Sequence, residues 1–363
     1  MFDHTHYVPI LRGKLGEFSA LEEATADVKS QMTPLIEVPL IPWDWQNEEP
    51  AKTVDAHVSQ IGHRLERSWG TQRPLFIDLI WIPEDEILAN GSHPLTYVLE
   101  DGRNIGVKLI PVTGLGRDDN YQRAAREGAR QDGLGVCIRL EDDDFEDLAA
   151  LEGRLGELVR LFELSPGEVD IVLDFRAIAA GQTSTFVLAV QSVIRSLPSL
   201  ADWRTLTLAA SAFPENLSGF SIGVMGTQRA EWTVWQALAN SRTKMPRLPT
   251  FGDYAINYPE PTEEVDPRIM RMSANLRYTS DGEWLIFKGR NVRDFGYEQF
   301  NQLCRALVQR SEYTGPDFSW GDGYIRRCAD NRDGPGSATT WRKVGTSHHL
   351  AFVTDQIANF SWI

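Results

Sequence analysis

Short apolar, β-branched segments alternate along this chain with longer segments whose apolar residues recur at helical spacing. The short segments predict strands at residues 7–11, 34–38, 74–80, 107–112, 134–139, 168–174, 205–210 and 249–255. The longer segments predict helices at residues 18–31, 54–67, 95–100, 120–130, 145–162, 184–197, 228–239 and 297–309. The chain therefore reads as a series of strand–helix units.

Alternation of strands and helices favours a parallel sheet, because each parallel neighbour needs a crossover connection. Eight units suit a closed barrel. An open doubly wound sheet is the alternative, but it usually has fewer strands, and no G-x-G-x-x-G follows the first strand. We predict an α/β fold, a single (β/α)8 TIM-like barrel domain over residues 1–363.

Two segments are additional to the eight strand–helix units of a minimal barrel. Residues 257–295 form an insertion after the eighth strand, and its stretch 275–287 predicts a β-hairpin that turns at residues 280–282. Residues 313–363 are rich in Trp, Gly and Arg and include a predicted helix at 348–358. We expect this C-terminal segment to fold back and close the mouth of the barrel.

Composition narrows the functional classes. The 363 residues are 42% hydrophobic, enough for a sizeable core, and carry a net charge of −15. That charge argues against general nucleic-acid binding and against acidic membranes. The 3 cysteines show no C-x-x-C spacing, which favours a reducing compartment. With no signal-peptide pattern and no long apolar run, we expect a cytoplasmic protein.

Charged residues cluster where the predicted strands end, the place at which (β/α)8 barrels carry their sites. These residues are Arg12, Lys14, Glu37, Asp78, Arg139, Asp174, Arg176 and Asp253. One interpretation is a ligand site at the mouth. The other is a network of ion pairs that only fills the lumen of the barrel. The sequence leaves both open.

Within this set the carboxylates and the cations suggest different roles. Glu37, Asp78 and Asp174 are the candidate acid/base residues. Lys14, with Arg139 or Arg176, is the candidate anion clamp.

Motifs that would name a reaction are missing. The chain has no G-x-S-x-G, no H-E-x-x-H, no Walker A and no kinase motif set. His4 and His6 precede the first strand and would lie at the opposite end from the mouth. We therefore predict no metal site and no cofactor.

The C-terminal segment supplies further ligand-binding candidates, namely Trp320, Asp322, Trp341, Arg342, His348 and His349. Tryptophan beside a charge suits stacking on a planar ligand. Alternatively, the tryptophans plug the barrel end and Asp322 pairs with Arg342. Neighbouring helical residues diverge by about 100°, so the two histidines would face different partners. Thr346 or Ser347 is the expected N-cap of their helix.

Five stretches of the chain resemble the phage-type beta protein family of bacteria, phages and mobile elements. They cover residues 7–17, 34–39, 294–304, 319–329 and 339–350. Ser347 departs from the pattern, in which an Asn is expected. The resemblance spans nearly the whole chain and implies a role in conflict between bacteria and mobile elements. It implies no reaction and no set of catalytic residues.

Two functions follow as hypotheses. The first is a binding or regulatory barrel that recognises, at its mouth, a protein partner encoded nearby or a phosphate-bearing small ligand. The second is a hydrolase acting on a phosphodiester or nucleotide. It would use the mouth carboxylates as acid and base and the Arg and Lys residues as anion clamps.

Overall fold

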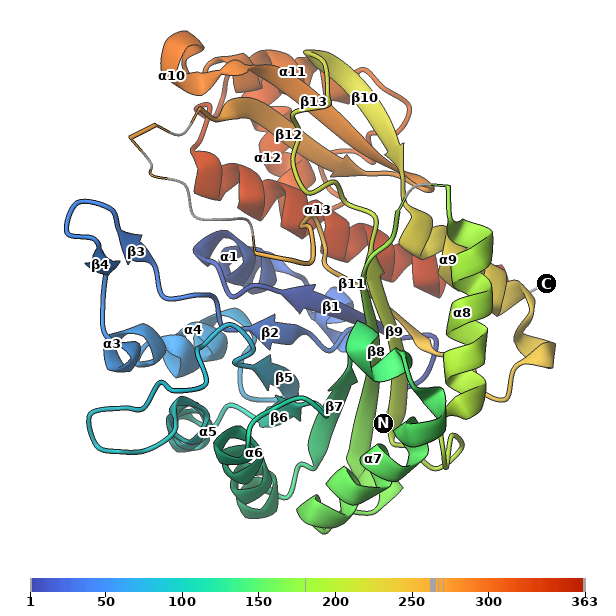
Figure 1. Ribbon diagram of the computed structural model, residues 1–363. Helices are drawn as coiled ribbons and strands as arrows, with labels where there is room; N and C mark the ends of the chain where they lie inside the picture. The colour runs from blue at the N-terminus through green and yellow to red at the C-terminus, as the bar shows by residue number, and fades with distance from the viewer. Residues whose placement is uncertain (1, 180, 262–265, 267, 270, 362–363) are drawn as a thin grey trace.

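The computed structural model describes residues 2–179, 181–261, 266, 268–269 and 271–361. Eight parallel strands close into a barrel in the order β1-β11-β9-β8-β7-β6-β5-β2 (Figure 1). They are β1 (Tyr7–Leu11), β2 (Leu35–Glu37), β5 (Leu75–Asp78), β6 (Leu109–Thr113), β7 (Val136–Leu140), β8 (Val169–Ala177), β9 (Thr205–Ser211) and β11 (Thr250–Asp253). Each corresponds to one of the eight predicted strands, and the predicted barrel is confirmed.

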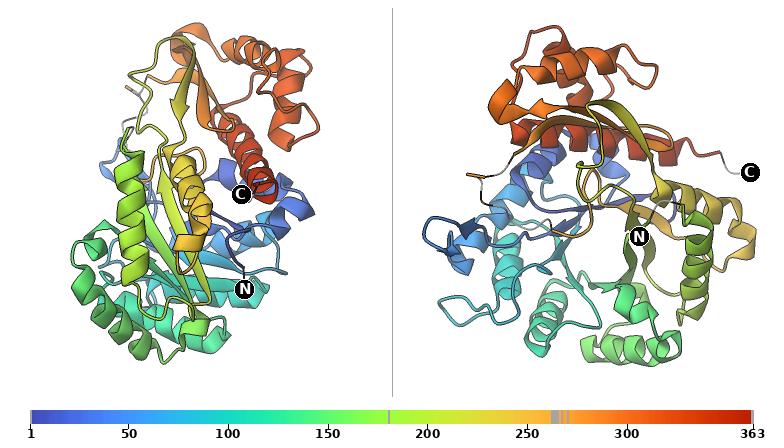
Figure 2. Two further views of the ribbon diagram at one scale, coloured as in Figure 1. Left: turned by 90° about the vertical axis from the view of Figure 1, so that its right-hand side faces the viewer. Right: turned by 45° about the horizontal axis from the view of Figure 1, so that its top comes forward.

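Helices surround the barrel between successive strands (Figures 1 and 2). They are α1 (Leu15–Glu23), α2 (Ala26–Ser30), α3 (Val54–Val58), α4 (Ile61–Ser68), α5 (Pro94–Ile105), α6 (Asp119–Asp132), α7 (Leu148–Phe162), α8 (Thr183–Ser196) and α9 (Ala230–Asn240). Short 3-10 turns occur at Asp142–Phe145, Pro166–Glu168 and Arg242–Lys244. The first two predicted helices are each divided into two shorter ones.

A three-stranded sheet stands above the barrel in the order β10-β13-β12 (Figure 1). The hairpin of β12 (Ser273–Thr279) and β13 (Glu283–Asn291) was predicted, whereas β10 (Gly223–Gln228) was not. With α10 (Val292–Phe295), α11 (Gln299–Val308) and α12 (Trp320–Ala329), this sheet forms a unit that we call the cap. Residues 262–265, 267 and 270 of the predicted insertion, and 362–363 of the C-terminal segment, lie outside the described residues.

The eighth helix of the barrel is α13 (Ala338–Ala358), not the predicted helix at 297–309. The latter corresponds to α11, which packs on β12 and β13 of the cap. Helix α13 packs against α1, β1 and β12, so it lies along the outside of the barrel beneath the cap. This placement makes α13 part of the barrel wall, and closure of the mouth by the C-terminal segment stays a prediction. We call the boundary between barrel, α13 and cap the seam.

Helix α13 also begins earlier than predicted. Its N-cap is Ser337, whose side chain accepts a hydrogen bond from the backbone N–H of Thr340. Thr346 and Ser347, the predicted caps, lie within the helix and are buried. No helix in the described part of the chain has the length and apolar character needed to cross a membrane.

The lumen of the barrel changes character along its axis. Apolar side chains from seven of the strands fill the lower part, among them Val8, Ile10, Phe76, Val112 and Val172. Above them, towards the C-terminal strand ends, the inward positions hold charged side chains. Because side chains alternate along a strand, Ile10 and Arg12 face inward together, as do Val172 and Asp174.

Candidate functional site

One arginine, Arg139 at the end of β7, occupies the centre of the mouth with no exposed surface. Its Nη2 donates to Glu37 at 2.8 Å and its Nη1 donates to Asp78 at 2.8 Å. Its Nε and Nη2 both donate to Asp174. Burial alone would lower the pKa of Arg139, but Tyr254 and the three carboxylates raise it well above its usual value.

Each of the six carboxylate oxygens around Arg139 accepts at least one hydrogen bond from the protein. Glu37 also accepts from Trp81 Nε1 at 2.9 Å. Both oxygens of Asp78 accept from Arg117 Nη2, at 3.0 and 3.2 Å. The second oxygen of Asp174 accepts from the backbone N–H of Arg176 at 3.0 Å. All three carboxylates are fully buried, so they form an internal network.

Three of these partners form the rim of the mouth. The side chains of Arg117 and Arg176 keep 13% and 14% of their surface exposed. Arg176 follows an irregularity in the β8–β9 pairing and has a left-handed φ of 52°. Its guanidinium lies over the ring of Trp81 and pairs with Glu141. The rim therefore interleaves opposite charges around one aromatic face.

Arg12 and Lys14 lie at the side of the mouth nearest the seam. Arg12 is 6% exposed, and its Nη2 donates to the backbone oxygens of Tyr258 and Pro259. Lys14 is half-buried and is the N-cap residue of α1, where its backbone N–H donates to Glu17. In the described part of the chain, Arg12 makes no hydrogen bond or salt bridge with the Arg139 network, although the charge of Glu37 acts on it.

Asp253 was expected at the mouth, but it faces the opposite side of β11. The inward residue is its neighbour Tyr254, whose hydroxyl donates to Asp174 at 2.5 Å. Asp253 instead accepts from the Tyr7 hydroxyl at 2.5 Å and from Nε2 of His349 at 2.9 Å. It thus joins the barrel wall to α13. Because strand side chains alternate, a shift of one residue separates the two roles.

The two histidines of α13 face different partners, as their spacing predicts. His348 has Asp322 at 2.9 Å from Nδ1 and the backbone oxygen of Thr279 at 2.9 Å from Nε2. Both ring nitrogens of His348 therefore have an acceptor within hydrogen-bond distance. Burial would raise the pKa of Asp322, but His348, Ser319 and Tyr278 together hold it below its usual value.

The C-terminal tryptophans belong to the hydrophobic core of the cap, Trp320 from α12 and Trp341 from α13. Trp341 stacks on Phe300 with ring centroids 4.2 Å apart, and its Nε1 donates to a backbone oxygen. Trp320 stacks on Tyr324, and the Lys343 ammonium lies 3.7 Å from its ring centroid. Asp322 pairs with His348 and not with Arg342, so the predicted Asp322–Arg342 salt bridge is wrong.

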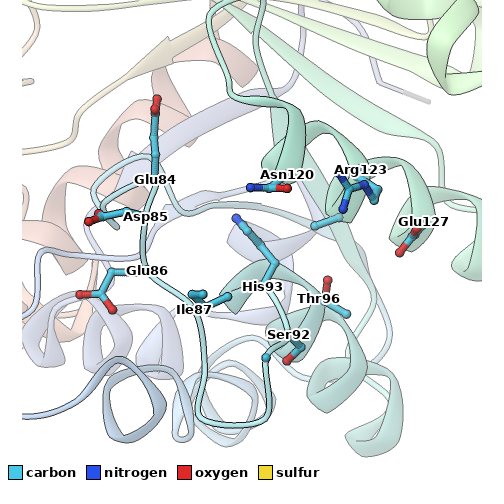
Figure 3. A pocket seen from close by; sticks show the side chains of 12 residues that line it. Glu84, Asp85, Glu86, Ile87, Ser92, His93, Thr96, Asn120, Arg123 and Glu127 are labelled. Atoms are coloured by element: carbon cyan, nitrogen blue, oxygen red, sulfur yellow. The ribbon is translucent and has the colours of Figure 1, made fainter.

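A hollow of about 460 Å³ opens beside the mouth, between the loop that precedes α5 and the first turns of α6. In Figure 3, the His93 ring and the Asn120 amide turn towards each other across it, while Asp85 and Glu86 turn away. His93 Nδ1 accepts from a backbone N–H, so Nε2 carries the ring proton. Burial lowers the pKa of His93, although Asp118 opposes this effect.

This hollow leads towards the Arg139 network. It shares Glu84 and His93 with a smaller cavity of about 50 Å³, which is also lined by Arg117 and Tyr121. Arg117 is the residue that binds Asp78 from the rim. A ligand in the hollow would therefore lie within reach of the mouth.

Sequence reasoning missed several of these residues. Trp81, Arg117 and Tyr254 lie in loops or at the end of a strand, where no periodicity marks them. Asp142 also escaped notice. Partial burial, followed by the negative charges of Asp174, Asp143 and Glu260, raises its pKa to about 6.

In the described residues, no group of three or more His, Cys, Asp or Glu side chains is arranged to hold a metal ion. No curated protein matches the chain. The family model described as Beta protein matches residues 7–355, nearly the whole length. The barrel, its charged mouth and its C-terminal cap are therefore the structure of a chain that belongs to the Beta protein family.

Proposed function

We propose that this protein is a binding and regulatory barrel in conflict between bacteria and mobile elements, and that it recognises a phosphate-bearing small ligand. The observation that carries the choice of binding over catalysis is the occupation of all six carboxylate oxygens around Arg139. A general base needs a lone pair aimed at its substrate. Glu37, Asp78 and Asp174 are fully buried, and each of their oxygens already accepts a hydrogen bond from within the protein, which directs them at protein donors and not at a substrate.

The hollow beside the mouth supports a ligand of this class. Its volume of about 460 Å³ falls within the usual range for small-molecule sites. Arg123 and the Nε2–H of His93 supply donors along it, and Arg117 supplies donors at its inner end. Arg117 commits only Nη2 to Asp78, so other N–H groups of its guanidinium can bind an anion.

The test is a thermal-shift titration with ATP, AMP and inorganic phosphate. A nucleotide at a hundred times its dissociation constant should stabilise the protein by about 2.7 kcal/mol. Arg123→Gln should weaken this response, because it removes a lining cation. Arg130→Gln, on the same helix but outside the hollow, is the matched control. A response that is equal in both variants would contradict the proposed site.

A hydrolase is the second candidate, and Asp142 is the observation that favours it. A carboxyl with a pKa of about 6 at the C-terminal end of a barrel strand can exchange protons near neutral pH. Release of phosphate from a nucleotide by the wild type, lost in Asp142→Asn and kept in Asp143→Asn, would favour catalysis. Ligand binding without turnover would favour recognition.

A further inference from the structure

We propose a second site, at the seam, where Arg12, Arg277 and Arg342 together bind an oxyanion such as phosphate. The three residues come from the barrel, the cap and α13 respectively. This proposal does not depend on the ligand proposed for the hollow. Its evidence is the placement of three arginines at the seam, none of which has a carboxylate partner among the described residues.

Two of the arginines hold the same short segment of backbone. Arg12 Nη2 donates to the backbone oxygens of Tyr258 at 2.6 Å and Pro259 at 2.5 Å. Arg277 Nη1 donates to the backbone oxygen of Ile256 at 2.7 Å. These acceptors lie within four consecutive residues after β11, so the two guanidinium groups bind neighbouring parts of one segment.

Close helix packing brings the third arginine to the same place. A Cβ on Gly16 would lie 2.9 Å from the Cβ of Arg342, so α13 presses on the start of α1. A Cβ on Gly345, one turn further along α13, would lie 3.2 Å from the backbone oxygen of Arg277. Gly16 lets α13 approach α1, and Gly345 lets it approach β12. Arg342 lies on α13 between these two points of close approach.

None of the three arginines forms a salt bridge within the described part of the chain. The carboxylates whose charge acts on Arg12 are Glu17 and Glu37. Glu17 accepts from Asn257 Nδ2 and from the backbone N–H of Lys14, and the oxygens of Glu37 belong to the mouth network. Only 6% of the surface of Arg12 is exposed, yet its buried Nε has no hydrogen-bond partner among the described residues. A buried donor of this kind is costly unless something accepts from it.

The positive charge of Arg342 acts on both of the other arginines. Burial and, after it, the charge of Arg342 lower the pKa of Arg277 to about 10. Burial lowers the pKa of Arg12, the charges of Glu37 and Glu17 oppose this shift, and Arg342 adds a smaller contribution in the same direction as burial. An anion at this point would relieve the repulsion and supply acceptors for the spare N–H groups. Phosphate fits because its tetrahedral oxygens can each meet a separate guanidinium.

The site would also couple the cap to the barrel. The anion would contact one residue from each of the three parts that meet at the seam, so its binding should hold them together. Inorganic phosphate and the phosphate group of a nucleotide carry the same chemistry. A titration of each, under the same conditions, separates the two sources.

The experiment measures the melting temperature and the calorimetric dissociation constant of the full chain in phosphate, pyrophosphate and AMP, in a buffer with a weakly binding anion. We expect saturable stabilisation of the wild type by phosphate. Arg342→Gln and Arg277→Gln should each weaken phosphate binding roughly tenfold or more, because each removes a charged hydrogen bond. Arg195→Gln, an exposed arginine of α8, is the charge-matched control and should bind as the wild type does.

A second readout separates loss of the site from loss of the fold. Without phosphate, Arg342→Gln should melt at the same temperature as the wild type or higher, because it relieves repulsion and keeps the aliphatic stem on Gly16. Arg123→Gln, in the hollow, should leave the phosphate response unchanged. The proposal is overturned if phosphate does not bind the wild type, or if it binds Arg342→Gln and Arg277→Gln as well as it binds the wild type. A response to AMP alone would also overturn it.

Discussion

The mouth and the seam both gather arginines within a short distance, yet they balance the charge differently. At the mouth, Arg139 meets three carboxylates, and its neighbours Arg117 and Arg176 also have acidic partners. At the seam, within the described residues, Arg12 and Arg277 donate to backbone oxygens, and Arg277 also donates to the side-chain oxygen of Asn275. Among the same described residues, neither they nor Arg342 have a carboxylate partner. The charges of the mouth are therefore balanced within the protein, whereas those of the seam are balanced by the proposed anion. Density of charge alone does not identify a binding site.

The largest effect should come from removing the central cation of the mouth. Arg139→Met leaves three fully buried carboxylates without their shared partner. Breaking one buried pair costs about 3–5 kcal/mol, so the loss here should exceed that range and abolish folding. Urea denaturation and the yield of folded protein measure it. Arg195→Met is the control, and a variant destabilised by less than about 1 kcal/mol would show that the network is dispensable.

A smaller effect is expected where the seam does contain an ion pair. Asp322→Asn removes the charge that faces His348 and keeps the shape of the side chain. Because both groups are fully buried, we expect a loss of about 3 kcal/mol, measured by chemical denaturation near pH 7. Asp330→Asn, at the partly exposed C-cap of the same helix, weakens only solvent-screened pairs with Arg326 and Arg332 and should change stability by less than about 1 kcal/mol. Equal effects would mean that the buried pair contributes little.

The smallest effect is the pH dependence of stability that comes from Glu231, a buried carboxyl next to the seam. Glu231 is 2% exposed, and burial raises its pKa to about 7, although Arg229 opposes the rise. A carboxyl whose folded pKa lies above its unfolded value stabilises at low pH and loses that contribution as pH rises through 7. This group alone should therefore cost about 2 kcal/mol between pH 5 and pH 8.

Denaturation of wild type and Glu231→Gln at both pH values tests this assignment. The glutamine variant should lose markedly less stability than the wild type over the same interval. Glu283→Gln, an exposed residue of β13, serves as the control and should behave as the wild type does. An unchanged difference in Glu231→Gln would assign the pH dependence to another group.

The barrel itself was predictable because its signal is repeated. Each strand is a short apolar run, and each outer helix buries one stripe, so local errors do not alter the topology. β10 escaped prediction for a physical reason. All but one of its residues are exposed, it contains two glycines, and it exists through pairing with β13, which lies far away in sequence. α12 likewise begins with Trp320-Gly321-Asp322-Gly323, a poor helical pattern that its N-cap Ser319 stabilises.

The candidate site was predictable in its membership but not in its use. Glu37, Asp78, Arg139 and Asp174 converge as the strand ends require. Whether an arginine there can still bind a ligand depends on how many protein acceptors already surround its N–H groups. The number of acceptors is set by three-dimensional packing, which the sequence does not show. The alternation rule failed for Asp253 by one residue, because the sequence does not show whether it or Tyr254 faces inward.

The position of α13 has a consequence for biosynthesis. In chain order, the cap strands β12 and β13 and the helices α11 and α12 all come between β11 and the helix that covers it. During translation, the outward-facing side chains of Tyr7 and Asp253 therefore stay uncovered until α13 has left the ribosome. A nascent chain halted before residue 338 should present that uncovered wall to chaperones, although all eight strands have already been made.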